Sequence, residues 1–253
     1  MRIGSLFAGI GGLELGLERA GIGETVWQVE INEYCRAVLA KHWPHAERYE
    51  DVRTVGKSTL APVDLICGGF PCTDVSSAGK RVGLAGAQSG LWFEYKRIVS
   101  ELRPTWVVVE NVTSGAAKWV DAVQEDLGEL GCASVPFPLT ASALGFDHKR
   151  ARIFVVAISN ADQVGIRVEQ RRLEGPSRKG EVQSSVACEA RQAQTAERSV
   201  AYCERLPLKR VVRGVHGLPK KLDTTRRRQS ALGNSVIPAC AEVIGHIIAE
   251  LMR

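Results

Sequence analysis

Short apolar runs alternate with amphipathic segments along most of this chain. The apolar runs are typical of buried strands and cover residues 2–6, 25–29, 63–67 and 105–109, with a further strand end near 49–52. Apolar residues at helical spacing predict helices at about 13–20, 32–42, 91–102, 116–130 and from 238 onwards. This alternation predicts an α/β fold, in which helices cover both faces of a mainly parallel sheet.

A glycine-rich loop at residues 7–12 connects the first strand to the first helix. Leu13 and Leu17 form an apolar stripe on that helix, whereas Glu14 and Glu18 lie on the opposite side, which we expect to face solvent. Strand, glycine loop and helix open many nucleotide-binding units, because glycines let a ligand approach the backbone N–H groups at the helix start. The loop lacks the full GxGxxG pattern, so alone it is weak evidence for a nucleotide.

Acidic residues follow the next two predicted strands. Glu30 lies about twenty positions after the glycine loop, where a carboxylate can bind both ribose hydroxyls of a nucleotide. The alternative for Glu30 is a charge at a helix N-terminus that favours the helix dipole. Asp51 follows the third strand end and could accept a hydrogen bond from an adenine amino group.

A cysteine follows the apolar run at 63–67. Glycines end the strand, and Pro71 stiffens the backbone directly before Cys72. Cys72 therefore lies at the carboxyl end of a strand, where open α/β sheets bind their ligands. A buried free cysteine beside a turn is the ordinary alternative. The polar residues 76–90 that come next show no periodicity, which is typical of a functional lid or of disorder.

The composition is that of an ordinary globular protein, with 253 residues of which 45% are hydrophobic and 24% charged. The beginning of the chain lacks the features of a signal peptide, and no uncharged apolar run approaches the ~20 residues of a membrane helix. The seven cysteines are scattered without a CxxC pair, which favours reduced thiols over disulfides or a zinc site. We therefore expect a cytoplasmic protein without a metal ion.

Charge is distributed unevenly along the chain. Residues 1–130 carry 13 Lys and Arg against 17 Asp and Glu, a net of −4, whereas residues 131–253 carry 20 against 11, a net of +9. A basic half suits a protein that presents one face to a polyanion, although it can also be a solvated surface. Residues 159–208 are polar, with Tyr202 as their one aromatic residue, and could be partly disordered without a nucleic acid.

Six short blocks, in order along the chain, resemble those of the DNA (cytosine-5)-methyltransferase family. They are FAGIGG at 7–12, Glu30 with Ile31, GGFPC at 68–72, Glu110-Asn111-Val112, HKRAR at 148–152 and GNSV at 233–236. The FPC and ENV blocks at this separation are specific for the family, and the likeness covers residues 3–158 and about 211–250. Thr73, Ser5 and His148 depart from the family's usual Gln, Asp and Gln, which leaves the finer contacts around the target base open.

The resemblance implies a Rossmann-like S-adenosylmethionine-dependent methyltransferase sheet with a small, basic target-recognition insert. The catalytic domain is expected at residues 1–158 plus 229–253, and a short target-recognition region at 159–228. The residues assigned to the cofactor S-adenosyl-L-methionine are Phe7, Ala8, Gly9, Ile10, Gly12, Glu30, Ile31, Asp51, Val52, Pro71, Leu91, Asn234 and Val236. Those assigned to DNA are Ser76, Lys80, Arg81, Arg171 and Arg172, for whose charged members a solvated surface is the ordinary alternative.

The same resemblance implies chemistry at carbon 5 of cytosine. This carbon is a poor nucleophile, and addition of the Cys72 thiolate at carbon 6 makes it reactive towards a methyl donor. Glu110 is expected to contact ring nitrogen 3 and the exocyclic amine, Arg152 the ring oxygen at position 2, and Arg150 the base or a phosphate. The cytosine must leave the duplex stack, because a stacked base is out of reach.

Double-stranded DNA is the expected partner of a monomeric enzyme, and a cognate restriction endonuclease is a candidate further partner in the cell. One alternative is a transfer RNA cytosine-5 methyltransferase of the same family. Another is a DNA-binding relic without activity, against which the intact Cys72, Glu110 and Arg152 argue. The glycine loop alone would also fit a dinucleotide dehydrogenase, which explains neither FPC nor ENV.

Overall fold

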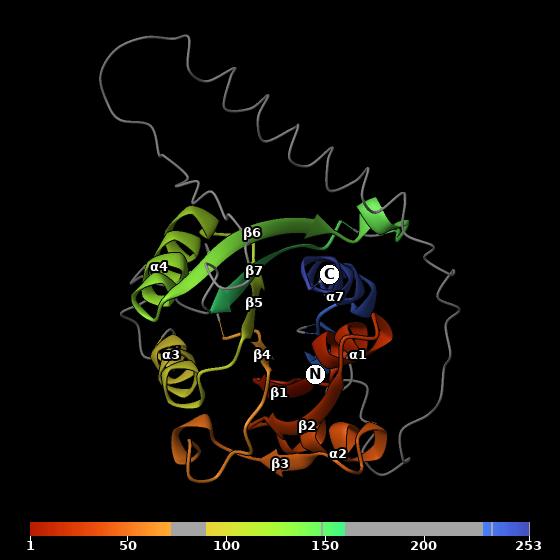
Figure 1. The fold of residues 1–253 in the computed structure, drawn as a ribbon. Helices are drawn as coiled ribbons and strands as arrows, with labels where there is room; N and C mark the ends of the chain where they lie inside the picture. Colours follow the sequence, from red (N-terminus) through yellow and green to blue (C-terminus); the bar gives the residue numbers. More distant parts are fainter. Residues whose placement is uncertain (72–89, 148, 160–229, 234, 253) are drawn as a thin grey trace, which may run out of the picture.

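The computed structural model describes residues 1–71, 90–147, 149–159, 230–233 and 235–252 (Figure 1). Its strands are β1 (Arg2–Leu6), β2 (Glu24–Val29), β3 (Glu47–Tyr49), β4 (Leu65–Gly68), β5 (Trp106–Val112), β6 (Cys132–Thr140) and β7 (Ala151–Ser159). Its helices are α1 (Gly12–Arg19), α2 (Glu33–His42), α3 (Leu91–Leu102), α4 (Ala116–Glu129) and α7 (Pro238–Leu251), with 3-10 turns η1 (Val52–Thr54) and η3 (Ser142–Leu144). The five helices predicted from the hydrophobic pattern are confirmed.

Within the described residues the strands form one seven-stranded sheet in the order β3-β2-β1-β4-β5-β7-β6. β1 to β5 are mutually parallel, and β7 pairs antiparallel with both β5 and β6. The predicted α/β fold with a mainly parallel sheet is therefore confirmed. The chain runs from β1 outwards to β3 and returns to the other side of β1 as β4, which creates a switch point where ligands bind in open α/β sheets.

Side chains of the strands point alternately into two apolar layers, as the two-residue period of a strand requires. Ile66 and Val107 belong to the layer covered by α3 and α4. Leu65 and Val108 belong to the layer covered by α1 and α7. Figure 1 shows these two pairs of helices on opposite sides of the sheet.

The antiparallel edge of the sheet was not predicted from the hydrophobic pattern. β6 contains Pro136 and Pro138, which argue against a central strand, but β6 pairs with β7 alone and is an edge strand, where proline is tolerated. Every residue of β5, from Trp106 to Val112, is paired with a residue of β7, so β5 extends to Val112. Glu110 and Asn111 consequently lie inside the strand rather than beyond its end.

The first helix differs from its prediction, because Glu14 is completely buried rather than exposed to solvent. α1 lies against the sheet and also against α7, whose close approach requires Gly16: a Cβ there would lie 2.3 Å from the carbonyl oxygen of Pro238. Glu14 faces β2, where the Nε2 atom of Gln28 donates a hydrogen bond to it at 3.5 Å. Local periodicity cannot predict that a second helix, from the far end of the chain, covers α1.

The end of the chain is long and apolar enough between Ser230 and Leu251 to cross a membrane by length and composition alone. Residues 235–237 are not helical, however, and α7 buries Val243, Ile244 and Ile248 in the layer shared with α1. In the described structure α7 is therefore a core helix that brings both chain ends into one unit. The predicted target-recognition region lies outside the described residues, except for Ser159 at the end of β7.

Candidate active site

A cavity of about 640 Å³ lies at the carboxyl ends of β1, β2, β4 and β5. The predicted site residues that line it are Phe7, Gly9, Glu30, Ile31, Asp51, Val52, Pro71, Leu91, Glu110 and Arg152. Seven of them lie within three residues after the end of a parallel strand, and because parallel strands end at the same edge of a sheet, these residues converge. Among the described residues no group of three or more His, Cys, Asp and Glu side chains could hold a metal ion.

Glu30 connects the glycine loop to the start of α2. The backbone N–H of Gly9 donates to its Oε2 at 2.7 Å, and the backbone N–H of Asn32 donates to its Oε1 at 2.8 Å. Gly9 has a φ of 58°, a left-handed conformation that glycine adopts without strain. Each carboxylate oxygen can accept further hydrogen bonds, so Glu30 is held in place and still able to bind a ligand.

Four residues predicted to contact the cofactor do not line the cavity. They are Ala8, Ile10, Gly12 and Val236. A Cβ on Gly12 would lie 2.2 Å from the carbonyl oxygen of Val236, so this glycine allows the end of the chain to approach the loop. Ile10 packs instead with Tyr34 and Val38 of α2. These residues support the loop, and their direct contact with a cofactor stays a prediction.

The turn after β3 forms another part of the cavity wall. The carboxylate of Asp51 accepts hydrogen bonds from the backbone N–H of Arg53 at 3.0 Å and from its side chain at 3.1 Å. The backbone hydrogen bond is the main reason that the pKa of Asp51 is lowered, so this side chain is an anion. Val52 beside it is buried, whereas Ile31 exposes 62% of its surface and offers an apolar contact for a ligand.

The backbone before Cys72 is fixed against β5. Asn111 donates through Nδ2 to the carbonyl oxygen of Phe70 at 3.1 Å, and the Phe70 ring packs 5.5 Å from Trp92 and 6.0 Å from Trp119 between ring centroids. A Cβ on Gly69 would lie 2.6 Å from Oε2 of Glu110, so a larger residue at position 69 would displace this carboxylate. The strand end, the loop and Glu110 therefore form one rigid wall of the cavity.

Glu110 forms an ion pair with Arg152, whose Nε lies 2.9 Å from its Oε1. The register explains the contact: Arg152 lies opposite Val112, and antiparallel pairing places it on the same side of the sheet as Glu110. Burial raises the pKa of Glu110 to about 7, although both Arg152 and Arg150 lower it. Oε1 is buried, and within the described residues it meets the Arg152 guanidinium without accepting a hydrogen bond of good geometry.

Arg150 does not line the cavity. Its Nη2 donates to the carbonyl oxygen of Ser235, which connects the start of β7 to the segment before α7. Burial, together with the nearby Arg152, lowers the pKa of Arg150. A contact of Arg150 with a base or a phosphate stays a prediction.

Several predicted residues lie outside the described part of the chain. They are Cys72, Ser76, Lys80, Arg81, Arg171, Arg172 and Asn234. Conversely, the structure shows a role for Asn111 that the sequence argument did not assign. The sequence signals for that role are its position beside Glu110 near the carboxyl end of a strand and its place in the Glu110-Asn111-Val112 block.

The parallel sheet, the glycine loop and the cavity at the switch point are those of a Rossmann-like methyltransferase fold. Residues 1–217 match the model of the C-5 cytosine-specific DNA methylase family, and the chain belongs to this family.

Two similar proteins have Type II methyltransferase names. The chain is 32% identical over 165 residues to Type II methyltransferase M2.BsuMI of Bacillus subtilis, which covers 62% of this chain and 42% of that protein. It is 33% identical over 165 residues to Type II methyltransferase M.HhaI of Haemophilus parahaemolyticus, which covers 63% of this chain and 50% of that protein. The matched part therefore spans half of these relatives or less.

A solved structure supports the fold over the whole chain. It is described as a proposed DNA modification methyltransferase encoded within an E. coli prophage, and it shares 19% identity with this chain at a TM-score of 0.63. The alignment covers 100% of this chain and 99% of the solved one. At this identity the likeness supports the architecture alone.

Proposed function

We propose that this protein transfers a methyl group from S-adenosyl-L-methionine to carbon 5 of a flipped-out cytosine in double-stranded DNA, through a covalent bond between Cys72 and carbon 6. Membership of the family supports the general reaction. The observation that carries the proposal is the ion pair between the buried Glu110 and the partly buried Arg152, which lines the same cavity as Pro71, the residue directly before Cys72.

The cavity residues fit the proposed cofactor. Glu30 is held by two backbone N–H groups and can accept hydrogen bonds from ribose hydroxyls. Asp51 can accept a hydrogen bond from the adenine amino group, and Ile31 and Val52 offer apolar contacts to the adenine ring. When bound, the cofactor supplies an electrophilic methyl group carried on a positively charged sulfur.

Glu110 and Arg152 are proposed to bind the cytosine and to stabilise the charge that enters its ring. A Glu110 with a pKa of about 7 holds a proton near neutral pH and can donate it in a hydrogen bond to ring nitrogen 3. Arg152 has five N–H groups; one meets Glu110 and another donates to the carbonyl oxygen of Ala151 at 2.8 Å. Donors therefore remain for the ring oxygen at position 2.

Cys72 is proposed as the nucleophile. Its thiol loses a proton, the sulfur forms a bond to carbon 6, and electrons move towards ring nitrogen 3 and the oxygen at position 2. After carbon 5 has been methylated, a base removes the proton of carbon 5 and the bond between sulfur and carbon 6 breaks. Asn111 and Phe70 restrict the backbone before Cys72, which supports precise placement of the sulfur.

The proposed substrate requires a cytosine outside the duplex stack. We also propose a cognate restriction endonuclease as a partner in the cell, because the similar proteins carry Type II names. Bisulfite sequencing of plasmid DNA from cells that express the protein tests the reaction and reports the target sequence. Wild-type protein should protect cytosines within one sequence, and Cys72→Ser should protect none.

A second measurement tests the covalent intermediate. Duplex DNA with 5-fluorocytosine in that sequence should trap the wild-type protein, because fluorine cannot leave as a proton does. Peptide mapping should place the adduct on Cys72, and an adduct on another cysteine would contradict the assignment. Methylation of transfer RNA without methylation of duplex DNA would favour the transfer RNA alternative instead.

A further inference from the structure

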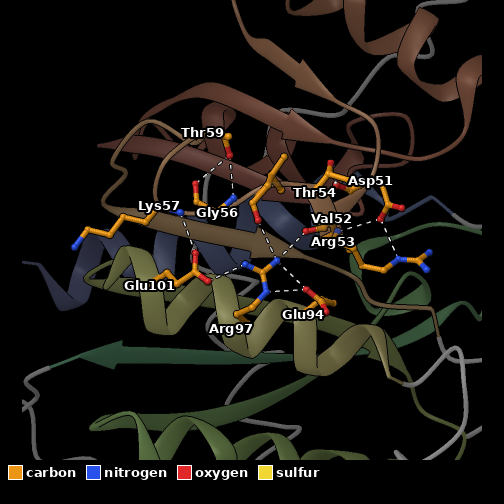
Figure 2. Close-up of polar contacts among 11 residues, drawn as sticks. Asp51, Val52, Arg53, Thr54, Gly56, Lys57, Thr59, Glu94, Arg97 and Glu101 are labelled. Carbon is orange, nitrogen blue, oxygen red and sulfur yellow. Dashed lines mark hydrogen bonds and ion pairs between the residues drawn. The ribbon is translucent and has the colours of Figure 1, made fainter.

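One arginine of α3, Arg97, contacts the turn that follows β3 (Figure 2). Arg97 does not itself line the cavity. Arg97 donates through Nη2 to the carbonyl oxygens of Val52 and Val55, both at 3.0 Å. These carbonyls belong to η1 and to the residue that ends it, and a short helical turn leaves its last carbonyls without partners of its own. Arg97 therefore caps the turn that carries Asp51 and Val52 into the cavity wall.

Two carboxylates of the same helix fix the guanidinium. Glu94 accepts a hydrogen bond from Nε of Arg97 at 2.8 Å, and Glu101 accepts one from Nη1 at 2.8 Å. Glu101 also accepts the backbone N–H of Lys57 at 2.9 Å, so it contacts the segment that continues the turn. A Cβ on Gly56 would lie 2.4 Å from Oε2 of Glu101, which shows how closely helix and backbone approach.

α3 also contacts the opposite part of the site. Its first residue, Leu91, lines the cavity, and Trp92 packs against Phe70 beside the proposed nucleophile. One helix thus contacts both the turn after β3 and the loop before Cys72. Among the described residues, Arg97 contacts the first of these two regions and not the second, so its removal should affect one end of the cavity selectively.

We propose that Arg97 is a positioning residue, which holds the turn Asp51–Val55 in the conformation that binds the adenine end of the cofactor. The inference rests on the proposed function of the cavity as a cofactor site. A planar guanidinium is required because Nη2 donates to two carbonyls, while Nε and Nη1 donate to the carboxylates of Glu94 and Glu101. The Glu94 carboxylate also lies 2.7 Å from Nη2, and an ammonium group cannot match this geometry.

Isothermal titration with S-adenosylhomocysteine, performed well below the melting temperature of each variant, tests the proposal. Arg97→Met should raise the dissociation constant about tenfold or more, and Arg97→Lys, which can reach one carbonyl, should have an intermediate effect. The matched control is Lys96→Met, which removes a neighbouring cation of α3 that pairs instead with Asp126 and Glu129 of α4. Lys96→Met should leave the dissociation constant within about twofold of wild type.

Hydrogen exchange separates this role from a general loss of stability. Arg97→Met should accelerate exchange of the backbone amides of residues 52–59 without bound ligand, whereas Lys96→Met should not. Unchanged affinity in Arg97→Met, or equal weakening in both variants, would overturn the inference while leaving the proposed function intact. Failure of the wild-type protein to bind S-adenosylhomocysteine would overturn the proposed cofactor site, and the positioning role with it.

Discussion

The cavity wall around Glu110 and the interior beneath α1 around Glu14 each contain a buried glutamate. Glu14 has no exposed surface and Glu110 has 7%. Burial is the main cause that raises the pKa of each carboxyl to about 7. By exposure and acidity alone, the two residues would be equal candidates for a catalytic acid.

Their neighbours separate them. Glu110 lies 2.9 Å from a guanidinium nitrogen and lines the cavity, so a ligand can reach it. Within the described residues, Glu14 does not line the cavity and has no cation beside it; Gln28 donates a long hydrogen bond to it, and hydrogen bonding lowers its pKa only in part against the effect of burial. The comparison shows that a raised pKa reports burial, whereas a cavity and a complementary charge identify a site.

Glu110→Gln should give the largest effect, which should appear in catalysis and not in cofactor binding. The amide fills the same space but cannot hold the proton offered to ring nitrogen 3, so single-turnover methyl transfer should slow by about 10²–10⁴-fold. The affinity for S-adenosylhomocysteine should change little, because Glu30 and Asp51 are untouched. Glu14→Gln is the control and should retain the wild-type rate. Equal slowing in both variants would mean that the rate reports the fold rather than the site.

The pH dependence of the rate provides a second test of the same residue. If protonated Glu110 is the active form, the turnover rate should fall as pH rises above about 7, and Glu110→Gln should lack this decline. Loss of the Cys72 proton has the opposite effect: it should make the turnover rate rise with pH until the thiol is ionised. A wild-type rate that only rises between about pH 6 and 9 would indicate that Glu110 acts as an anion.

Glu14→Gln should instead change stability, with a defined dependence on pH. The folded pKa of Glu14 is raised from 4.5 to about 7, so its favourable contribution is complete below about 4.5 and is lost as pH rises through about 7. Gln carries no charge and does not titrate. The melting temperature of Glu14→Gln relative to wild type should therefore rise between about pH 4.5 and 7 and level off above that, by an amount equivalent to a few kcal/mol.

The same substitution at Glu110 should show no such gain. Glu110→Gln leaves the charge of Arg152 partly buried without its partner, which offsets the relief of the buried carboxyl. Guanidinium chloride unfolding of both variants at two pH values measures the difference. A Glu14→Gln variant with the pH dependence of wild type would show that Glu14 is not the group that titrates.

The sequence predicted the parallel half of this molecule well, because each element there is encoded locally. Apolar runs mark β1, β2, β4 and β5, and the spacing from the glycine loop is sufficient to identify Glu30 as a cavity residue. Features that depend on distant segments were missed. Pro136 and Pro138 conceal an edge strand, and the return of α7 onto α1 buries Glu14 against expectation.

In the site, too, single residues could be predicted from local sequence, whereas contacts between distant segments could not. Glu110 and Arg152 were both predicted, but their contact depends on the antiparallel register of β5 and β7, which local patterns do not contain. Arg97 gave no sequence signal, because the two carbonyls that it binds lie more than 40 positions away on the turn after β3. Residues that hold backbone from a distance are visible only in three dimensions.

Glu30 is a third carboxylate that can be compared with Glu110 and Glu14. Its substitution is expected to have the smallest effect of the three. Backbone N–H groups of Gly9 and Asn32 hold it, so it differs from Glu110 and Glu14 in being bound by the main chain. Glu30→Ala should weaken S-adenosylhomocysteine binding by about 1–3 kcal/mol, the scale of lost hydrogen bonds to a charged group. Glu24→Ala, which removes an exposed acid at the other end of β2, is the matched control.

Two roles of Glu30 can be distinguished by comparing Glu30→Ala with Glu30→Gln. If Glu30 binds ribose directly, Glu30→Gln should retain part of the affinity, because one oxygen still accepts a hydrogen bond. If Glu30 only fixes the start of α2, both substitutions should lower the melting temperature while calorimetry gives the wild-type dissociation constant. An unchanged dissociation constant in Glu30→Ala would return Glu30 to a helix-end role, and the ribose would then have to be bound by other residues of the cavity.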